Sequence, residues 1–195
     1  MDCAPLPAPA AQQGPAHRPI GTDRLVLRPL TVDDAEDLFP VFSDGESMRF
    51  WSCLPHRAPR ETRTMLDGML ARDDGSSRMW AVTLDGGRCL GWTSLYGADG
   101  RLVWLGYILA PEARGRGLAT EAVAATLRYA FEEWDMHRIE ANLDPRNDRS
   151  ARLLERLGFC REGVRREDFL IGDRYHDTLI YGLLAAEWRQ SRVPA

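Results

Sequence analysis

The chain has 195 residues and 44% hydrophobic content, which is enough for one sizeable core and favours a single domain. Its 25 basic and 29 acidic residues give a formal net charge of −4, so there is no general attraction to nucleic acid or to an anionic membrane. Four scattered cysteines without a CxxC pair argue against a metal site and a secreted disulfide framework. No run approaches membrane-spanning length, and we expect a soluble cytoplasmic monomer or homodimer.

The predicted organisation is a disordered tail over residues 1–20, one domain over 21–190 and a short tail over 191–195. The first twenty residues are rich in alanine and proline, a composition that buries too little apolar surface to offset chain entropy. The domain is expected to open with a half-buried strand near Leu25 and Leu27, and a helix capped at Thr31 follows.

A second helix is predicted over residues 59–72, because Met65, Leu66, Met69 and Leu70 repeat at helical spacing. The looser segment before it, residues 45–57, is a natural substrate-facing loop. Three strand-like runs come next and are joined by Asp-Gly turns, which predicts an antiparallel meander. These runs cover residues 79–84, 89–96 and 102–109.

The second half of the chain predicts a crossover and a final hairpin. A long amphipathic helix over residues 120–134 separates the strand ending at Leu109 from another over 137–143, so these two strands should be parallel neighbours. Asn147 is expected to cap a short helix that Gly158 ends. The remaining strands, 164–171 and 175–184, flank Gly172-Asp173 and should form a hairpin.

The most informative segment, Pro-Glu-Ala-Arg-Gly-Arg-Gly-Leu-Ala over residues 111–119, joins a strand to the long helix. Gly115 and Gly117 permit conformations in which successive N–H groups turn toward one anion. The helix start adds unpaired donors and the positive end of its dipole. Arg114 and Arg116 add charge that suits phosphate oxygens. The segment therefore predicts a site for a diphosphate-bearing ligand.

Two common phosphate motifs do not fit this segment. Ala119 and Thr120 stand where the dinucleotide fingerprint requires a further glycine, and the Gly-Lys-Ser/Thr of nucleotide-triphosphate loops is missing. The pattern Arg114-x-x-Gly117-x-Ala119 instead resembles the acyl-coenzyme A pyrophosphate loop of the GCN5-related N-acetyltransferases. Four further motifs resemble those of the group that contains the ribosomal-protein-alanine N-acetyltransferases, and they occur in the same order along the chain. They are Leu25-x-Leu-Arg28-Pro, Gly106-Tyr107, Asn147-x-x-Ser150 and Tyr175-x-Asp177.

This resemblance, which spans Thr22 to Trp188, implies an α/β fold with a mixed sheet. About seven mostly antiparallel strands are expected, with the parallel strands 102–109 and 137–143 splayed apart and helices on both faces. The implied cofactor is acetyl-CoA, and the amide near Ile108 would polarise its thioester carbonyl. The residues implied to bind the cofactor are Ile108, Leu109, Arg114, Gly115, Arg116, Gly117, Leu118, Ala119, Asn147 and Ser150.

Acetyl transfer needs a neutral amine and a protonated leaving thiolate. Glu140 matches a strand glutamate that some family members use as a base, while an exposed strand residue is the alternative interpretation. Ser150 or Tyr175 would donate to the departing sulfur. No cysteine has a nucleophile-like setting, which favours direct attack. Aromatic candidates for the acceptor pocket are Phe50, Trp51, Trp80, Tyr96 and Trp104.

The sequence thus predicts an N-acetyltransferase for a primary amine. The group resemblance favours a protein N-terminal α-amine as the acceptor. Two alternatives stay open: a small amine such as an aminoglycoside or a polyamine, and a non-catalytic module that binds acyl-CoA.

Overall fold

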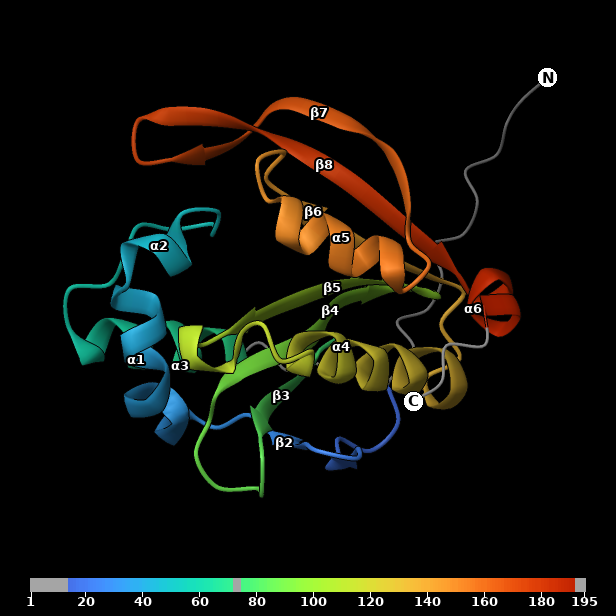
Figure 1. Ribbon diagram of the computed structural model, residues 1–195, viewed down its shortest axis with the longest axis horizontal. Coiled ribbons are helices and arrows are strands. Elements are labelled where there is room, and N and C mark those ends of the chain that lie inside the picture. The colour runs from blue at the N-terminus through green and yellow to red at the C-terminus, as the bar shows by residue number, and fades with distance from the viewer. Residues whose placement is uncertain (1–13, 72–74, 192–195) are drawn as a thin grey trace.

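The computed structural model describes residues 14–71 and 75–191 and has one eight-stranded sheet at its centre (Figure 1). The strand order is β1-β2-β3-β4-β5-β6-β8-β7, and only β5 and β6 are parallel. The expected meander and final hairpin are present. The strands are β1 (Ile20–Gly21), β2 (Val26–Pro29), β3 (Arg78–Thr83), β4 (Gly91–Asp99), β5 (Leu102–Leu109), β6 (Arg138–Leu143), β7 (Cys160–Ile171) and β8 (Arg174–Leu184).

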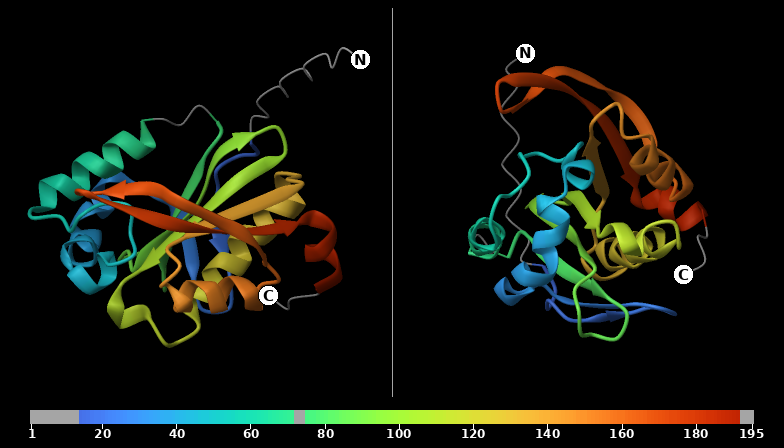
Figure 2. Two further views of the ribbon diagram at one scale, coloured as in Figure 1. Left: turned by 90° about the horizontal axis from the view of Figure 1, so that it is seen from above. Right: turned by 60° about the vertical axis from the view of Figure 1, so that its left-hand side comes forward.

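Helices cover both faces of the sheet, as Figure 2 shows in its right-hand view. One face packs against α1, α2 and α3, and the other packs against α4 and α5. The helical segments are η1 (Val32–Asp34), α1 (Ala35–Ser43), α2 (Gly45–Met48), α3 (Pro59–Leu70), η2 (Pro111–Ala113), α4 (Leu118–Arg128), η3 (Tyr129–Glu133), α5 (Asp148–Arg156) and α6 (Ala185–Ser191). The mixed α/β fold predicted from the sequence is confirmed.

Side chains along β5 point alternately to the two faces of the sheet, so this strand packs against both helical layers. Val103 and Leu105 are buried in the core beneath α4, whereas Ile108 is buried in the core beneath α1 and α3. Successive side chains of a strand point to opposite faces, so Trp104 lies on the α1 side. The sheet therefore presents one set of β5 side chains to each helical layer.

The start of the domain differs from the prediction. Residues 14–19, expected as part of a disordered tail, pack along β3, where the Trp80 indole N–H donates to the Arg18 carbonyl at 2.9 Å. Ile20 is buried and pairs with Leu27, which adds an eighth strand to the sheet. The rest of the predicted N-terminal tail, residues 1–13, lies outside the described residues, as do residues 192–195.

One additional helix and one helix boundary also differ from the prediction. The segment expected as a loop contains the short helix α2, because the Asp44 carboxylate accepts a hydrogen bond from the Ser47 N–H at 2.7 Å and caps it. Helix α4 begins at Leu118, two residues early, since Gly117 adopts φ 77° directly before it. Among the residues with described placement, no helix is long and apolar enough to cross a bilayer.

Candidate active site

The parallel strands β5 and β6 separate partway along their length. They pair only from Leu102 opposite Arg138 to Trp104 opposite Glu140. Beyond that point β5 stays paired with β4 to Leu109, and β6 stays paired with β8 to Leu143. The facing edges of β5 and β6 are therefore free of each other, as the splayed arrangement requires. Such an edge offers main-chain groups to an extended ligand.

The pairing of β5 with β4 decides which main-chain amide near Ile108 faces the gap. Ala110 donates its N–H to the Leu90 carbonyl at 2.8 Å, and the Ile108 carbonyl also faces β4, where it lies against Gly91. Main-chain groups of alternate residues point to opposite sides of a strand. The N–H groups of Tyr107 and Leu109 consequently face the gap toward β6, whereas that of Ile108 faces β4.

The loop after β5 is a cradle of main-chain donors. Gly115 and Gly117 have φ of 72° and 77°, conformations that a side chain disfavours. Within the described residues, none of the N–H groups from Gly115 to Thr120 donates a hydrogen bond. Six consecutive donors at the start of α4 form a concentrated site for an anion.

Arg114 is directed back into the fold rather than out of this loop. Its guanidinium donates to the Leu109 carbonyl at 3.1 Å and to the Ser47 hydroxyl at 2.8 Å. Burial lowers its pKa, while the carboxylate of Asp44 acts in the opposite direction. Arg114 thus joins the phosphate-type loop to α2 on the neighbouring layer.

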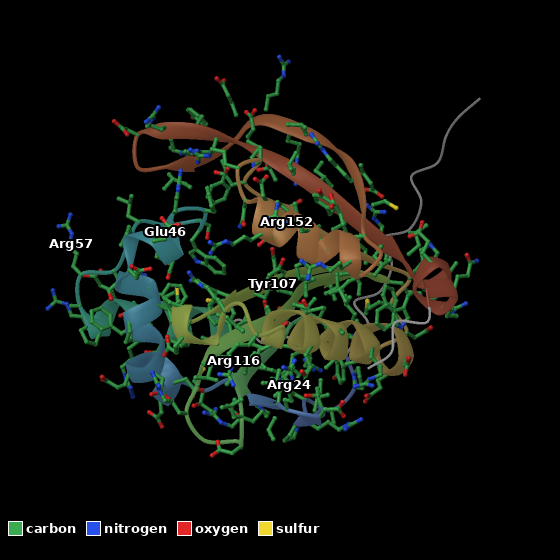
Figure 3. All side chains as sticks on the ribbon, in the orientation of Figure 1. Arg24, Glu46, Arg57, Tyr107, Arg116 and Arg152 are labelled. Atoms are coloured by element: carbon green, nitrogen blue, oxygen red, sulfur yellow. The ribbon has the colours of Figure 1, made fainter. Side chains whose placement is uncertain are left out.

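Asn147 and Ser150 lie together at the start of α5, across the gap from β5. The Asn147 side-chain oxygen accepts a hydrogen bond from the Ser150 N–H at 3.2 Å and caps the helix. Its amide nitrogen donates no hydrogen bond within the described part of the chain. The hydroxyl of Tyr107 is buried without a hydrogen bond from another described residue, and burial raises the pKa of Tyr107 to about 12. Figure 3 shows Tyr107 between α4 and α5.

Glu140 stands at the last paired position of β6, where the two strands part. Its neighbours Ile139 and Ala141 are buried toward α4, so Glu140 faces the α1 side of the sheet. Arg138 donates to its Oε1 atom at 2.8 and 3.0 Å, and the Oε2 atom accepts no hydrogen bond from another described residue. Arg138 also bonds Glu162 of β7, which holds the pKa of Glu162 below its usual range.

Two of the predicted acceptor aromatics lie beside Glu140. Tyr96 and Trp104 are opposite each other on β4 and β5, with ring centroids 6.5 Å apart, and Trp104 is in register with Glu140. Two further predicted aromatics, Phe50 and Trp51, follow α2 in the chain and have no recorded contact with Glu140. The guanidiniums of Arg49 and Arg146 lie 5.2 and 5.7 Å from the centroid of the Phe50 ring. Half-buried Trp51 packs on Phe42 and Trp92.

Two predicted site residues lie elsewhere. Trp80 is fully buried on the opposite face of the sheet, where it contacts Tyr129, so it cannot line an acceptor site near Glu140. Tyr175 is 63% exposed near the tip of the β7–β8 hairpin. It lies seven residues along β8 from Gly182, the partner of Glu140, which corresponds to roughly 20 Å of strand. Neither residue lies beside Glu140.

Two of the three described cysteines, Cys53 and Cys89, are poor candidates for a nucleophile. Cys89 is buried, its thiol donates to the Gly91 carbonyl at 3.1 Å, and burial raises its pKa to about 12. Burial also raises the pKa of Cys53, and Cys160 is exposed. A thiol with a raised pKa is a poor nucleophile. No group of metal-ligating side chains gathers in the parts of the chain described.

Sequence reasoning gave no role in the site to three of its neighbours: Arg138, Tyr107 and the Ser47 partner of Arg114. Arg138 could have been found, because residues two apart on a strand share a face and an arginine would meet Glu140 there. The contacts of Tyr107 and Ser47 join segments that are far apart in sequence, and no local pattern signals them.

Comparison with known proteins identifies the family of this chain. The profile of the acetyltransferase (GNAT) domain matches residues 24–160. The "Putative ribosomal N-acetyltransferase YdaF" of Bacillus subtilis is 36% identical over 172 residues, which are 85% of this chain and 94% of the relative. The "[Ribosomal protein uS5]-alanine N-acetyltransferase" of Escherichia coli is 38% identical over 89 residues, 46% of each chain.

A solved structure shows the same fold. It is the spermidine N-acetyltransferase from Vibrio cholerae in complex with CoA and spermine. The match has a TM-score of 0.74 and 24% identity, and it covers 86% of this chain and 99% of the other. Together with the splayed strands and the donor cradle, the family match leads to one conclusion: the chain belongs to the GNAT family and is an N-acetyltransferase.

Proposed function

We propose that this enzyme transfers the acetyl group of acetyl-CoA to a protein N-terminal α-amine by direct attack. The observation that carries the proposal is the gap between β5 and β6, which has a main-chain donor cradle at one end and Glu140 on the adjoining face. The cradle fits a diphosphate, and the free edge of β5 fits an extended amide-bearing arm. Bound acetyl-CoA would supply the activated acetyl group.

The chain's own groups divide the work of the reaction. The Leu109 N–H, turned into the gap, is the main-chain donor we assign to the thioester carbonyl, in place of Ile108. Asn147 contributes an amide N–H that its capping role leaves available. Ser150 is assigned to the departing sulfur, from its place in the first turn of α5. Glu140 accepts the amine proton through its free Oε2 atom, directly or through water.

Charge around Glu140 favours an α-amine over a polyamine. Arg138 compensates Glu140 and Glu162, and Arg146 compensates Asp144 at 2.6 Å. A polyamine carries several positive charges and is best held by carboxylates without such partners. A protein α-amine needs less negative charge around it, because its pKa of about 7.7 to 8.0 leaves part of it neutral at pH 7. The two ribosomal-protein relatives point to the same acceptor class.

An acceptor screen tests the proposal. Acetyl-CoA would be incubated with peptides that begin with Ala, Ser or Met and with spermidine, and free CoA would be followed by thiol detection. Peptides with a blocked N-terminus and an internal lysine are the matched controls. We expect turnover with at least one free N-terminus and none with the blocked peptides. Faster turnover of spermidine than of every peptide would contradict the assigned acceptor, and no CoA release with any amine would favour a binding module.

A further inference from the structure

The segment before β2 contacts the start of α4 through Arg24. The Arg24 guanidinium donates to the Arg116 carbonyl at 2.9 Å and to the Glu121 carboxylate at 2.6 Å. The main-chain N–H of Arg24 also donates to the Glu121 carboxylate, at 2.9 Å. Arg24 and Arg116 lie side by side at the start of α4 in Figure 3. These contacts link residues more than ninety positions apart to the donor cradle.

The bond to the Arg116 carbonyl has a consequence for the next amide. In a trans peptide the C=O and the following N–H point in opposite directions. When Arg24 holds the Arg116 carbonyl on its side, the Gly117 N–H is turned to the other side of the loop. A Cβ on Gly117 would stand 3.4 Å from the Arg24 Nη2 atom, so the guanidinium lies directly against this peptide. Arg24 therefore fixes the orientation of a cradle amide.

Glu121 adds an electrostatic reason for the same contact. It lies in the first turn of α4, where a carboxylate favours the helix but repels a diphosphate. Burial opposes its charge, yet hydrogen bonds from Thr22 and Arg24 outweigh burial and lower its pKa, so it stays ionised. Arg24 forms an ion pair with this carboxylate at 2.5 Å. Without Arg24, a negative charge would face the anion site unpaired.

We propose that Arg24 is a positioning residue for the diphosphate of the acetyl donor. It holds the Arg116 peptide and compensates Glu121, so that the cradle amides are oriented before the donor binds. It touches neither the acetyl group nor the amine. Its loss should therefore weaken donor binding and leave the chemical step unchanged at saturation.

The test compares Arg24→Ala with Arg18→Ala. Arg18 forms an exposed ion pair with Glu133 at 2.8 Å, near the far end of the same helical segment, and is a matched control. We expect Arg24→Ala to raise the Kd of CoA and the KM of acetyl-CoA about tenfold, the scale of one lost charge-assisted contact, with kcat unchanged. Arg18→Ala should change neither. Arg24→Lys should give an intermediate loss, since one ammonium cannot bridge both partners.

A truncated donor separates positioning from a general structural effect. S-acetyl-pantetheine lacks the diphosphate, so Arg24→Ala should use it as well as the parent does. Equal losses with both donors, or an unchanged Kd for CoA in a folded Arg24→Ala variant, would overturn the proposal. If circular dichroism shows that Arg24→Ala does not fold, the Kd of CoA and the use of the two donors are measured for Arg24→Lys instead. A parent enzyme that did not bind CoA would refute the donor assignment, and this inference with it.

Discussion

The proposed donor side and the proposed acceptor side of the site are built in different ways. The donor side consists of main-chain groups, the free β5 edge and six amides from Gly115 to Thr120, held in place by glycine conformations and a helix start. The acceptor side consists of side chains from separate elements, such as Tyr96, Trp104 and Glu140, in register across three strands. Main-chain recognition follows a local motif, whereas the acceptor surface exists only after the sheet has formed.

The difference separates what the family shares from what distinguishes its members. A backbone cradle tolerates changes in most side chains, so it suits a donor common to many enzymes. The acceptor surface depends on ion pairs such as Arg138 with Glu140, and changing a single partner alters its charge. We therefore expect substitutions on the two sides to affect different kinetic constants.

The largest effect is expected for Gly117→Asp. The residue has φ 77°, which a side chain disfavours, and the substitution adds a carboxylate to the loop that carries the cradle amides, beside Arg24. CoA affinity should fall by at least about a hundredfold, which corresponds to about 2.7 kcal/mol, as measured by calorimetry. Gly172→Asp is the matched control, since Gly172 has φ 63° in the hairpin turn with no atom near its Cβ position. Equal affinity in the parent and in folded Gly117→Asp would contradict the cradle.

Glu140→Gln is expected to have the next largest effect, on the acceptor side. If Glu140 accepts the amine proton, kcat/KM should fall about a hundredfold at pH 7. The loss should shrink at pH 9, because an α-amine with a pKa of about 7.7 to 8.0 is then already neutral. Glu162→Gln, which changes the other carboxylate on Arg138, should have little effect. A pH profile of all three proteins decides, and an equal loss at every pH would indicate packing instead.

The sequence was sufficient for most of the fold because its signals are local. Hydrophobic alternation, the Asp-Gly turns and the glycine that ends α5 each act within a few residues, and they predict the meander, the crossover and the hairpin. The packed segment 14–19 was missed, since its order depends on contacts with Trp80 and Tyr129 far along the chain. Proline and alanine composition carries no information about such partners.

The candidate site was predictable to the extent that it is made of backbone. The glycines of the loop and the capping position of Asn147 follow from local rules. Trp80 was assigned to the wrong face, because an aromatic residue on a strand fully buried on both sides shows no alternation in sequence. The direction of the Ile108 amide depends on the register with β4, which sequence does not reveal.

Asn147→Ser is expected to have a moderate effect on the donor side. Serine caps a helix about as well as asparagine, so α5 should keep its stability while the free amide N–H is lost. The KM for acetyl-CoA should rise about fivefold, in line with one lost hydrogen bond in a partly desolvated site. Steady-state kinetics and a thermal melt of the same samples measure both quantities. A lower Tm with an unchanged KM would leave capping as the sole role of Asn147.

The smallest effect is expected for Tyr175→Phe, which tests whether the tip of the β7–β8 hairpin belongs to the reacting site. Tyr175 is 63% exposed at the tip of the β7–β8 hairpin, whereas Ser150 lies in the first turn of α5. A group that protonates the departing sulfur must reach it within hydrogen-bond distance. Tyr175→Phe should therefore change kcat less than about twofold, and Ser150→Ala should lower it by more. A large loss of kcat in Tyr175→Phe, with KM values unchanged, would mean that the hairpin tip closes over the gap during turnover and belongs to the reacting site.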